Sequence, residues 1–230
     1  MKEVVSKHHP HHLILKKYDF IQFKMSCKLI WVTENAEKLI SYCCRVSNPK
    51  NQDNENIEGL LKYCIKNGHW SILQMASMCV EINTTRAISS QIIRHRSLNI
   101  QEFSQRYQKV EQDLEIPELR RQHPTNRQMS LNDLDEDLVN ELQYEIKKHF
   151  EASNLLYKRL LSYGVAKECS RAILPMNSPT KMYVSATLRD WFHFINVRTH
   201  ISTQKECRDI ALEIKRIFQE QFPIIGNLLD

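Results

Sequence analysis

The sequence is poor in glycine. Its 230 residues include 4 glycines, at positions 59, 68, 164 and 226, where an average chain of this length would have roughly 16. Dinucleotide-binding G-x-G-x-x-G motifs and P-loops need two or three glycines within a few residues. The nearest pair here is Gly59 and Gly68. The sequence therefore excludes a glycine-cradled nucleotide site, and side chains must do much of the work of binding any phosphate.

Metal-binding and membrane-spanning patterns are also missing. The 7 cysteines form no C-x-x-C pair and no ladder of zinc spacing, so we predict no metal site. Most of them stand among apolar residues, which predicts reduced, buried thiols, Cys43 and Cys44 included, and a cytoplasmic location. No apolar run approaches the ~18 residues of a membrane span. We therefore expect no membrane partner and no secretory signal.

The net charge of +5 is unevenly distributed. Residues 1–28 carry six lysines against Glu3 and Asp19, and the rest of the chain is close to neutral. A basic character confined to one end is weak evidence for nucleic-acid binding, and we expect no nucleic-acid partner. We interpret residues 1–24 as an N-terminal arm, expected to be flexible, and residues 25–230 as one folded domain.

Hydrophobic periodicity predicts alternating helices and strands. Residues 76–83 alternate strictly, as does a half-buried strand, and 181–186 predicts a second strand, with a short third one near 106–110. Helices are expected over 33–47, 55–67, 85–94, 130–160, 187–198 and 203–222, with N-terminal caps at Thr33, Ser130, Thr187 and Thr203. These elements indicate an α/β domain of the α+β type with segregated strands.

Arginine is concentrated in one region. Seven of the 14 arginines fall between Arg86 and Arg127, and the densest part reads Arg-His-Arg at 94–96 followed by a polar, unperiodic stretch to Arg106. Cations at a helix C-terminus are common, and this would explain Arg-His-Arg alone. It does not explain the Glu, Ser and Gln side chains that follow. Arginine forks bind phosphates and carbonyls bidentately. The stretch is thus typical of a nucleotide site built without a glycine loop.

This region resembles a known family. Arg94-His95-Arg96, seven residues and then Ser104 is similar to the R-H-R-x7-S signature of the flavin-dependent thymidylate synthases (ThyX). Other family segments follow in order over about residues 26–225: Arg45-Val46-Ser47, Asn67-Gly68-His69, Gly164-Val165 with Arg171 and Leu174-Pro175, the stretch 188–198, and Gln204 with Glu206. The resemblance implies a single domain with a small antiparallel sheet flanked by long helices.

The resemblance also implies an activity. Members convert dUMP to dTMP by reductive methylation, with methylenetetrahydrofolate as carbon donor and NADPH as reductant through FAD. They work as homotetramers whose active sites are shared between subunits, and without an enzyme nucleophile. Ser104 has no histidine partner nearby in sequence, so we assign it to substrate binding. Arg198 is the expected catalytic residue, because its charge would stabilise an ionised uracil ring.

The binding residues are carried over position by position. His69 would face the side where folate and NADPH approach the flavin. Gln74 departs from a common Glu of the family, and Thr187 from a common Asn. The residues expected to bind dUMP are Gln91, Arg94, Glu102, Ser104, Gln105, Arg106, Arg171 and Arg198. The residues expected to bind FAD are Ser47, Ser71, Arg94, His95, Arg96, Glu102, Thr187, Arg189 and His193.

Two alternative functions remain open at this point. The arginine cluster and the basic arm also suit a module that binds RNA or single-stranded nucleic acid, although the body of the domain is nearly neutral and lacks paired aromatic motifs. A related flavin-dependent methyltransferase acting on another uracil-containing substrate is the second alternative.

Overall fold

The computed structural model describes residues 25–111 and 114–229. The arm predicted over 1–24 lies outside the described residues. A four-stranded antiparallel sheet forms the centre, in the order β1 (Ser26–Val32), β2 (Ser77–Thr85), β6 (Pro179–Thr187) and β3 (Asn99–Glu102). Strands β2 and β6 pair over nine residues, from Ser77 opposite Thr187 to Thr85 opposite Pro179. The expected single mixed domain with an antiparallel sheet is confirmed.

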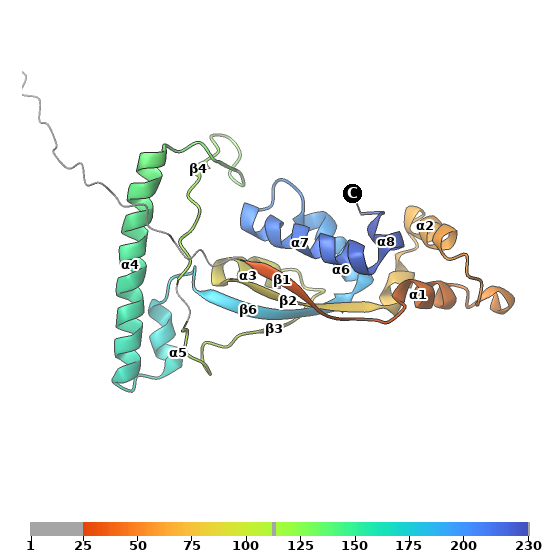
Figure 1. Ribbon diagram of the computed structural model, residues 1–230, viewed down its shortest axis with the longest axis horizontal. Helices are drawn as coiled ribbons and strands as arrows, with labels where there is room; N and C mark the ends of the chain where they lie inside the picture. Colours follow the sequence, from red (N-terminus) through yellow and green to blue (C-terminus); the bar gives the residue numbers. More distant parts are fainter. Residues whose placement is uncertain (1–24, 112–113, 230) are drawn as a thin grey trace, which may run out of the picture.

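One face of the sheet carries the hydrophobic core. Met78, Val80 and Ile82 of β2 and Met182 and Val184 of β6 are fully buried, as the alternation of 76–83 predicts. Helices α6 (Leu188–Arg198) and α7 (Lys205–Gln221) lie over this face (Figure 1). The helices bury their own apolar stripes against the strands, so the position of every residue on α6 is fixed by packing.

Aromatic residues of α6 complete the core. Trp191 and Phe194 are fully buried and meet edge to face, with ring centroids 5.7 Å apart. The Nε1 group of Trp191 donates a hydrogen bond to the carbonyl oxygen of Met78 at 2.9 Å. This bond satisfies the one polar group of a large buried ring and ties α6 to β2.

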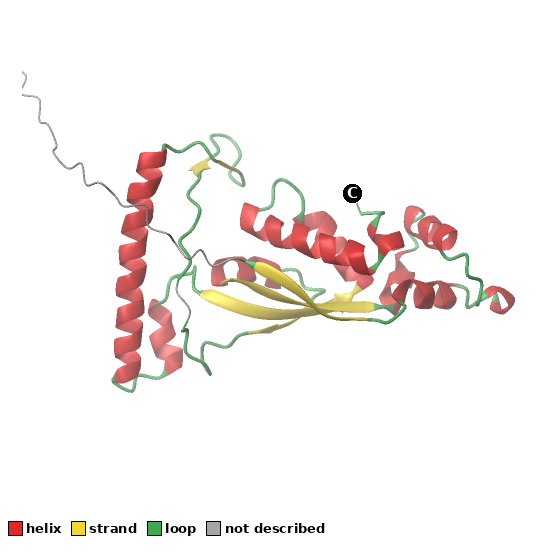
Figure 2. Ribbon diagram, in the orientation of Figure 1, coloured by secondary structure: helices red, strands yellow, loops and turns green. Residues whose placement is uncertain are grey.

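The opposite face of the sheet is uncovered within the described residues (Figure 2). Trp31 and Tyr183 are 45% and 43% exposed there. Glu81 of β2 and Lys181 of β6 form an ion pair of 3.3 Å. The sheet is therefore apolar on one side and mixed, with exposed aromatic rings, on the other.

Short helices gather at one end of the sheet: α1 (Ala36–Cys44), η1 (Pro49–Asn51), α2 (Glu58–Lys66), η2 (Trp70–Met75) and α8 (Pro223–Gly226). Arg45 holds the connection from α1 to α2, because its guanidinium donates to the carbonyl oxygens of Asn54 at 2.6 Å and Asn56 at 2.7 Å. The Oε1 atom of Glu37 in α1 accepts hydrogen bonds from the backbone amides of Ile224 and Ile225, both at 2.8 Å.

The longest helix, α4 (Glu136–Ser162), stands across the other end beside α5 (Lys167–Ser170) and η3 (Arg171–Ile173) (Figure 1). It buries Tyr157, whose hydroxyl accepts a hydrogen bond from the amide of Val110 at 3.2 Å. Four large side chains on a neighbouring face of the helix remain exposed: Leu138 42%, Leu142 41%, Leu156 46% and Tyr163 72%. A hairpin of β4 (Arg121–Gln122) and β5 (Ser130–Leu131) precedes α4.

Several predicted boundaries are confirmed. Thr187 caps α6, since its Oγ1 accepts from the amide of Asp190 at 3.3 Å. Gly68 and Gly164 end their helices with φ of 74° and 80°, a region that favours glycine. Helix α3 (Arg86–Ile93) follows β2 directly, as expected. None of the described helices is long and apolar enough to cross a membrane.

Other predictions are wrong. The long helix begins at Glu136 behind the cap Asp135, because Ser130 pairs with Gln122 in the hairpin. Thr33 caps no helix; its hydroxyl bonds to the backbone of Ser77 instead. Gln204, and not Thr203, precedes α7. Residues 106–110 form a turn and the irregular segment after it, while the real third strand is 99–102. Strand 26–32 has no counterpart among the predicted elements.

The cysteine prediction is correct in part. All seven thiols are free, and Cys64, Cys79 and Cys207 are buried. Cys43 and Cys44 are only half-buried, contrary to the prediction, because α1 presents one face to solvent at the edge of the molecule. Cys169 is exposed.

Candidate functional site

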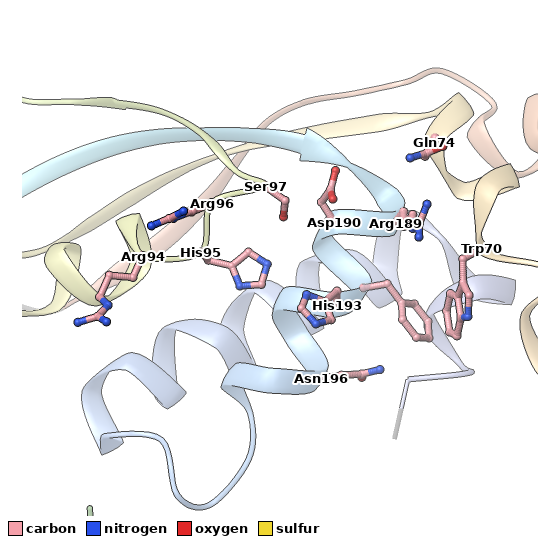
Figure 3. Close-up of a pocket in the computed structure, with 11 residues that line it drawn as sticks. Trp70, Gln74, Arg94, His95, Arg96, Ser97, Arg189, Asp190, His193 and Asn196 are labelled. Atoms are coloured by element: carbon pink, nitrogen blue, oxygen red, sulfur yellow. The ribbon is translucent and has the colours of Figure 1, made fainter. Parts of the chain in front are cut away.

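A cavity with a volume of about 710 Å³ opens between α6, η2 and the segment that follows α3. Five residues predicted to bind a flavin line it: Arg94, His95, Arg96, Arg189 and His193. Figure 3 shows their side chains around the same opening, with those of Trp70, Gln74, Ser97, Asp190 and Asn196. Its size lies in the ordinary range for ligand pockets.

The local fold explains how these side chains meet. Helix α3 ends at Ile93, so residues 94–97 leave it as a tight turn in which the amide of His95 donates to the carbonyl of Ile92 at 2.9 Å. On α6, Arg189, His193 and Asn196 follow the i, i+4, i+7 spacing of one helix face. Their face is opposite to that of buried Trp191 and Phe194. The side of α6 turned away from the core therefore presents polar groups to the cavity.

The cavity is rich in positive charge. Arg94, Arg96 and Arg189 contribute three guanidinium groups, and Asp190 is the single carboxylate among the described residues of the lining. The rings of His95 and His193 are in tilted contact, with centroids 5.1 Å apart and an interplanar angle of 43°. Burial first, and then the charges of His193 and Arg198, lower the pKa of His95, so its ring is held neutral at physiological pH. Such a lining suits an anionic ligand.

Arg198 is the last residue of α6 and lies outside the lining of this cavity, although its charge acts on His95, which is part of the lining. Its Nη2 donates to the backbone carbonyl of Gln91 at 3.1 Å. Its Nε is buried and has no hydrogen-bond partner among the described residues. A buried guanidinium N–H without a partner is costly, and it is the feature expected of a donor reserved for a ligand. The structure thus joins two residues of the predicted dUMP set, Gln91 and Arg198.

Glu102 is engaged elsewhere. At the end of β3 its carboxylate pairs with Arg86, a residue that the sequence analysis did not select, and accepts from the hydroxyl of Thr180 at 3.0 Å. It does not line the cavity. An ion pair that crosses from α3 to the sheet edge fixes β3 and the loop that continues into 103–107.

A third group of predicted residues surrounds the start of α5. Ser104 begins a turn in which its carbonyl accepts from the amides of Tyr107 and Gln108, both at 3.0 Å. Arg106 pairs with Glu168 at 3.2 Å. Gln105 is buried, and its Nε2 has no partner among the described residues. Arg171 begins η3, directly after α5.

The remaining predicted residues lie outside the cavity lining. Ser47, Ser71 and His69 are exposed, and Thr187 caps α6. His69 is adjacent to Trp70, which does line the cavity and packs on Phe192 with centroids 5.1 Å apart. Sequence analysis missed Asn196, although its spacing from Arg189 and His193 on one helix face signals it. No comparable signal identifies Trp70 and Phe192, which the fold brings together from separate elements.

The fold and the cavity define a mixed α+β domain with a positively charged cavity that is lined by arginines and histidines and contains no glycine loop. The model of the family described as "Thymidylate synthase complementing protein" matches residues 28–224. A probable flavin-dependent thymidylate synthase of Paramecium bursaria Chlorella virus 1 is 46% identical over 214 residues, covering 90% of this chain and 99% of the relative. The flavin-dependent thymidylate synthase of Synechocystis is 47% identical over 196 residues, covering 85% and 90%.

A solved structure agrees on the fold. The crystal structure of a UMP/dUMP methylase, PolB from Streptomyces cacaoi, bound with 5-Br dUMP, superposes with a TM-score of 0.79 at 21% identity, covering 90% of this chain and 94% of that chain. The chain belongs to the flavin-dependent thymidylate synthase family, as the motifs from Arg94 to Ser104 indicated.

Proposed function

We propose that this protein is a flavin-dependent thymidylate synthase that methylates dUMP to dTMP, with methylenetetrahydrofolate as carbon donor and NADPH as reductant through FAD. The observation that carries the proposal is the cavity lined by three arginines and by two histidines in ring contact, one of which, His95, is close enough to Arg198 for the charge of Arg198 to lower its pKa. Membership of the family and the names of its relatives support the same reaction. Those comparisons favour it over nucleic-acid binding.

The lining fits FAD. A pyrophosphate needs several positive donors, which Arg94, Arg96 and Arg189 offer, and Trp70 with Phe192 offers an aromatic wall for a planar ring system. When bound, the flavin would supply the hydride that reduces the transferred one-carbon unit. The other residues of the flavin set, Ser47, Ser71, His95, Glu102, Thr187 and His193, and His69 on the folate and NADPH side, remain part of the proposal.

Arg198 would act on the uracil ring. Its unpartnered, buried Nε is a donor for a ring carbonyl oxygen, while the bond to Gln91 holds the rest of the guanidinium in place. A fixed positive charge in a desolvated site stabilises negative charge drawn onto the ring, which makes its carbon more nucleophilic. No described hydrogen bond joins the Ser104 hydroxyl to a histidine, which supports a binding role for Ser104 over a nucleophilic one.

We also propose that the active site forms between subunits of a homotetramer. Most of the predicted dUMP ligands lie in two places within one chain: Gln91, Arg94 and Arg198 at the ends of α3 and α6, and Ser104 to Arg106 near α5. The exposed apolar stripe of α4 and the open sheet face offer surfaces that a second subunit can cover. A shared site would unite the two halves.

The test begins with the purified protein. We expect it to be yellow with FAD and to form dTMP only when dUMP, NADPH and methylenetetrahydrofolate are all present. UMP in place of dUMP tests the related methyltransferase activity. Protein that cannot be loaded with FAD would contradict the proposal, and oligonucleotide binding by such protein after deletion of residues 1–24 would revive the alternative.

Arg198→Ala tests the mechanism. We expect it to keep bound FAD but to lose turnover by about 10²–10³-fold, the range for removing one preorganised donor. Arg208→Ala is the matched control, since Arg208 also donates to a backbone carbonyl, that of Ile201 at 2.9 Å, but lies on exposed α7 surface. Equal turnover in the two variants would refute the role of Arg198.

A further inference from the structure

A chain of hydrogen bonds runs from the segment before β4 to Gln91. The Nη2 atom of Arg120 donates to Oε1 of Glu206 at 2.6 Å. The other oxygen of Glu206 accepts from Nε2 of Gln204 at 2.9 Å, and Oε1 of Gln204 accepts from Nε2 of Gln91 at 2.5 Å. The backbone carbonyl of Gln91 then receives Arg198. This series of hydrogen bonds thus ends on Gln91 and Arg198, two residues that are predicted to bind dUMP.

The carboxylate of Glu206 determines which group donates and which accepts in each of these hydrogen bonds. An ionised carboxylate accepts hydrogen bonds and donates none. Glu206 is ionised, since its hydrogen bonds from its own backbone amide, Arg120 and Gln204 outweigh burial and hold its pKa below the ordinary value. Gln204 must therefore turn its NH₂ toward Glu206 and its oxygen toward Gln91. Gln91 must in turn offer NH₂ to Gln204, which leaves its Oε1 as the group for a ligand.

The anchor is well shielded. The side chains of Arg120 and Glu206 are 11% and 18% exposed, so their ion pair is little weakened by solvent. Gln204 and Gln91 lie nearer the surface, where an unanchored amide pair would rotate freely between two orientations. The orientation of Gln91 therefore depends on the carboxylate two bonds away.

We propose that Gln204 and Glu206 are positioning residues that orient the side-chain amide of Gln91, so that its carbonyl oxygen accepts a hydrogen bond from the nucleotide. This inference rests on the proposed function, because it takes dUMP as the ligand of Gln91. The inference goes beyond the proposed function in one respect. It states that the carboxylate of Glu206 on α7, which can only accept hydrogen bonds, determines which side-chain atom of Gln91 on α3 faces the substrate.

The test is a double-substitution cycle read by titrating dUMP into the FAD-loaded enzyme and following the flavin absorbance. Glu206→Gln removes the obligatory acceptor, and we expect dUMP affinity to fall about five- to tenfold, the net value of one hydrogen bond. Gln91→Glu keeps an acceptor for the ligand, but it places a carboxylate oxygen against the side-chain oxygen of Gln204, where two acceptors repel. It should therefore weaken dUMP binding by at least as much as Glu206→Gln. FAD content should not change in either variant.

The double variant Q91E/E206Q decides the question. The amide introduced at position 206 can donate to the oxygen of Gln204, which reverses the orientation of Gln204. The NH₂ of Gln204 can then meet the carboxylate introduced at position 91, so the reversed chain again presents an acceptor. We expect the double variant to bind dUMP more tightly than Q91E alone. Multiplication of the two single effects would overturn the proposal, because residues that only support the fold have no reason to compensate in this direction.

Glu118→Gln is the matched control. It removes the other carboxylate beside Arg120, at 3.3 Å, together with the ion pair from Glu118 to Lys205 at 2.8 Å, and it keeps the hydrogen bonds that join Glu206, Gln204 and Gln91. We expect unchanged dUMP affinity, and a loss equal to that of Glu206→Gln would also overturn the proposal. Wild-type enzyme that carries FAD but binds no dUMP would instead contradict the proposed function itself.

Discussion

Glu115 makes the stability of the fold depend on pH. Its Oε2 is buried without a partner among the described residues, and burial, with the charge of Glu206 second, raises its pKa to about 7. The unfolded chain releases this proton near pH 4.5, while the folded protein keeps it up to about pH 7. The folded state binds more protons in this window, so stability falls as pH rises through it.

We therefore predict that Glu115→Gln stabilises the protein at pH 8 and not at pH 4.5. The amide stays neutral at every pH, which removes the cost of ionising a buried carboxyl next to Glu206. Thermal unfolding of wild type and variant at both values measures the difference in Tm. A gain of equal size at the two pH values would show that the effect comes from packing and not from ionisation.

Among the elements, α4 owes its start to one residue. Asp135 accepts hydrogen bonds from the amides of Asp137 and Leu138, both at 3.1 Å, and Glu136 and Asp137 add negative charge to the first turn. These features satisfy amides that the helix itself cannot pair and favour the positive end of its dipole. The cap stands directly after the hairpin that turns the chain.

Substitution of the cap residue Asp135 should lower stability more than substitution of Ser130, the cap that the sequence predicted. We predict that Asp135→Ala lowers the free energy of unfolding by about 0.5–2 kcal/mol, the usual value of an N-cap. Ser130→Ala, which loses an exposed bond from Arg120 at 3.0 Å, should cost less than about 0.5 kcal/mol. Urea titrations of the two variants give both numbers, and the reverse ranking would place the cap at Ser130.

The sequence predicts elements well where a local rule operates alone. The alternation of 76–83, the glycines at 68 and 164 and the Thr187 cap are local, and all three predictions are confirmed. Ser130 and Thr33 fail because another partner, Arg120 for Ser130 and the backbone of Ser77 for Thr33, takes the hydroxyl that would cap a helix. Strand 26–32 escapes prediction because it is an edge strand, whose polarity is set by solvent and by pairing with β2.

The candidate site likewise contains residues that local sequence spacing predicts and residues that only the tertiary fold brings together. Arg94 to Arg96 and the α6 residues are brought together by a helix end and a helix face, both readable from spacing. The contact of Trp70 with Phe192 joins elements distant in sequence, and the pairing of Glu102 with Arg86 joins two successive elements whose relative position the sequence pattern does not give. Whether Ser47, Ser71, His69 and Arg171 join the site stays a prediction that depends on assembly.

Assembly of the whole molecule can be tested on α4. Leu138, Leu142, Leu156 and Tyr163 share one exposed face of the helix. We predict that Leu156→Glu shifts the protein from the proposed tetramer to smaller species and that the proposed dTMP formation falls in parallel, because a charge in an apolar interface is unpaired. Light scattering coupled to size-exclusion chromatography measures the mass.

Lys158→Glu is the control for that substitution. It places the same carboxylate on the exposed opposite side of α4, where no interface is expected. The control should keep the mass and activity of wild type. A tetramer that survives Leu156→Glu would show that the stripe is not an interface, and would direct attention to the open sheet face.

The bond from Glu37 to the amides of Ile224 and Ile225 joins positions 187 and 188 residues apart. A ribosome adds ~5–20 residues per second, so about 10–40 s separate the emergence of the two partners during synthesis. Throughout that interval α1 exposes the surface that α8 will cover. Chaperones and proteases can therefore reach this surface of α1 before it is covered.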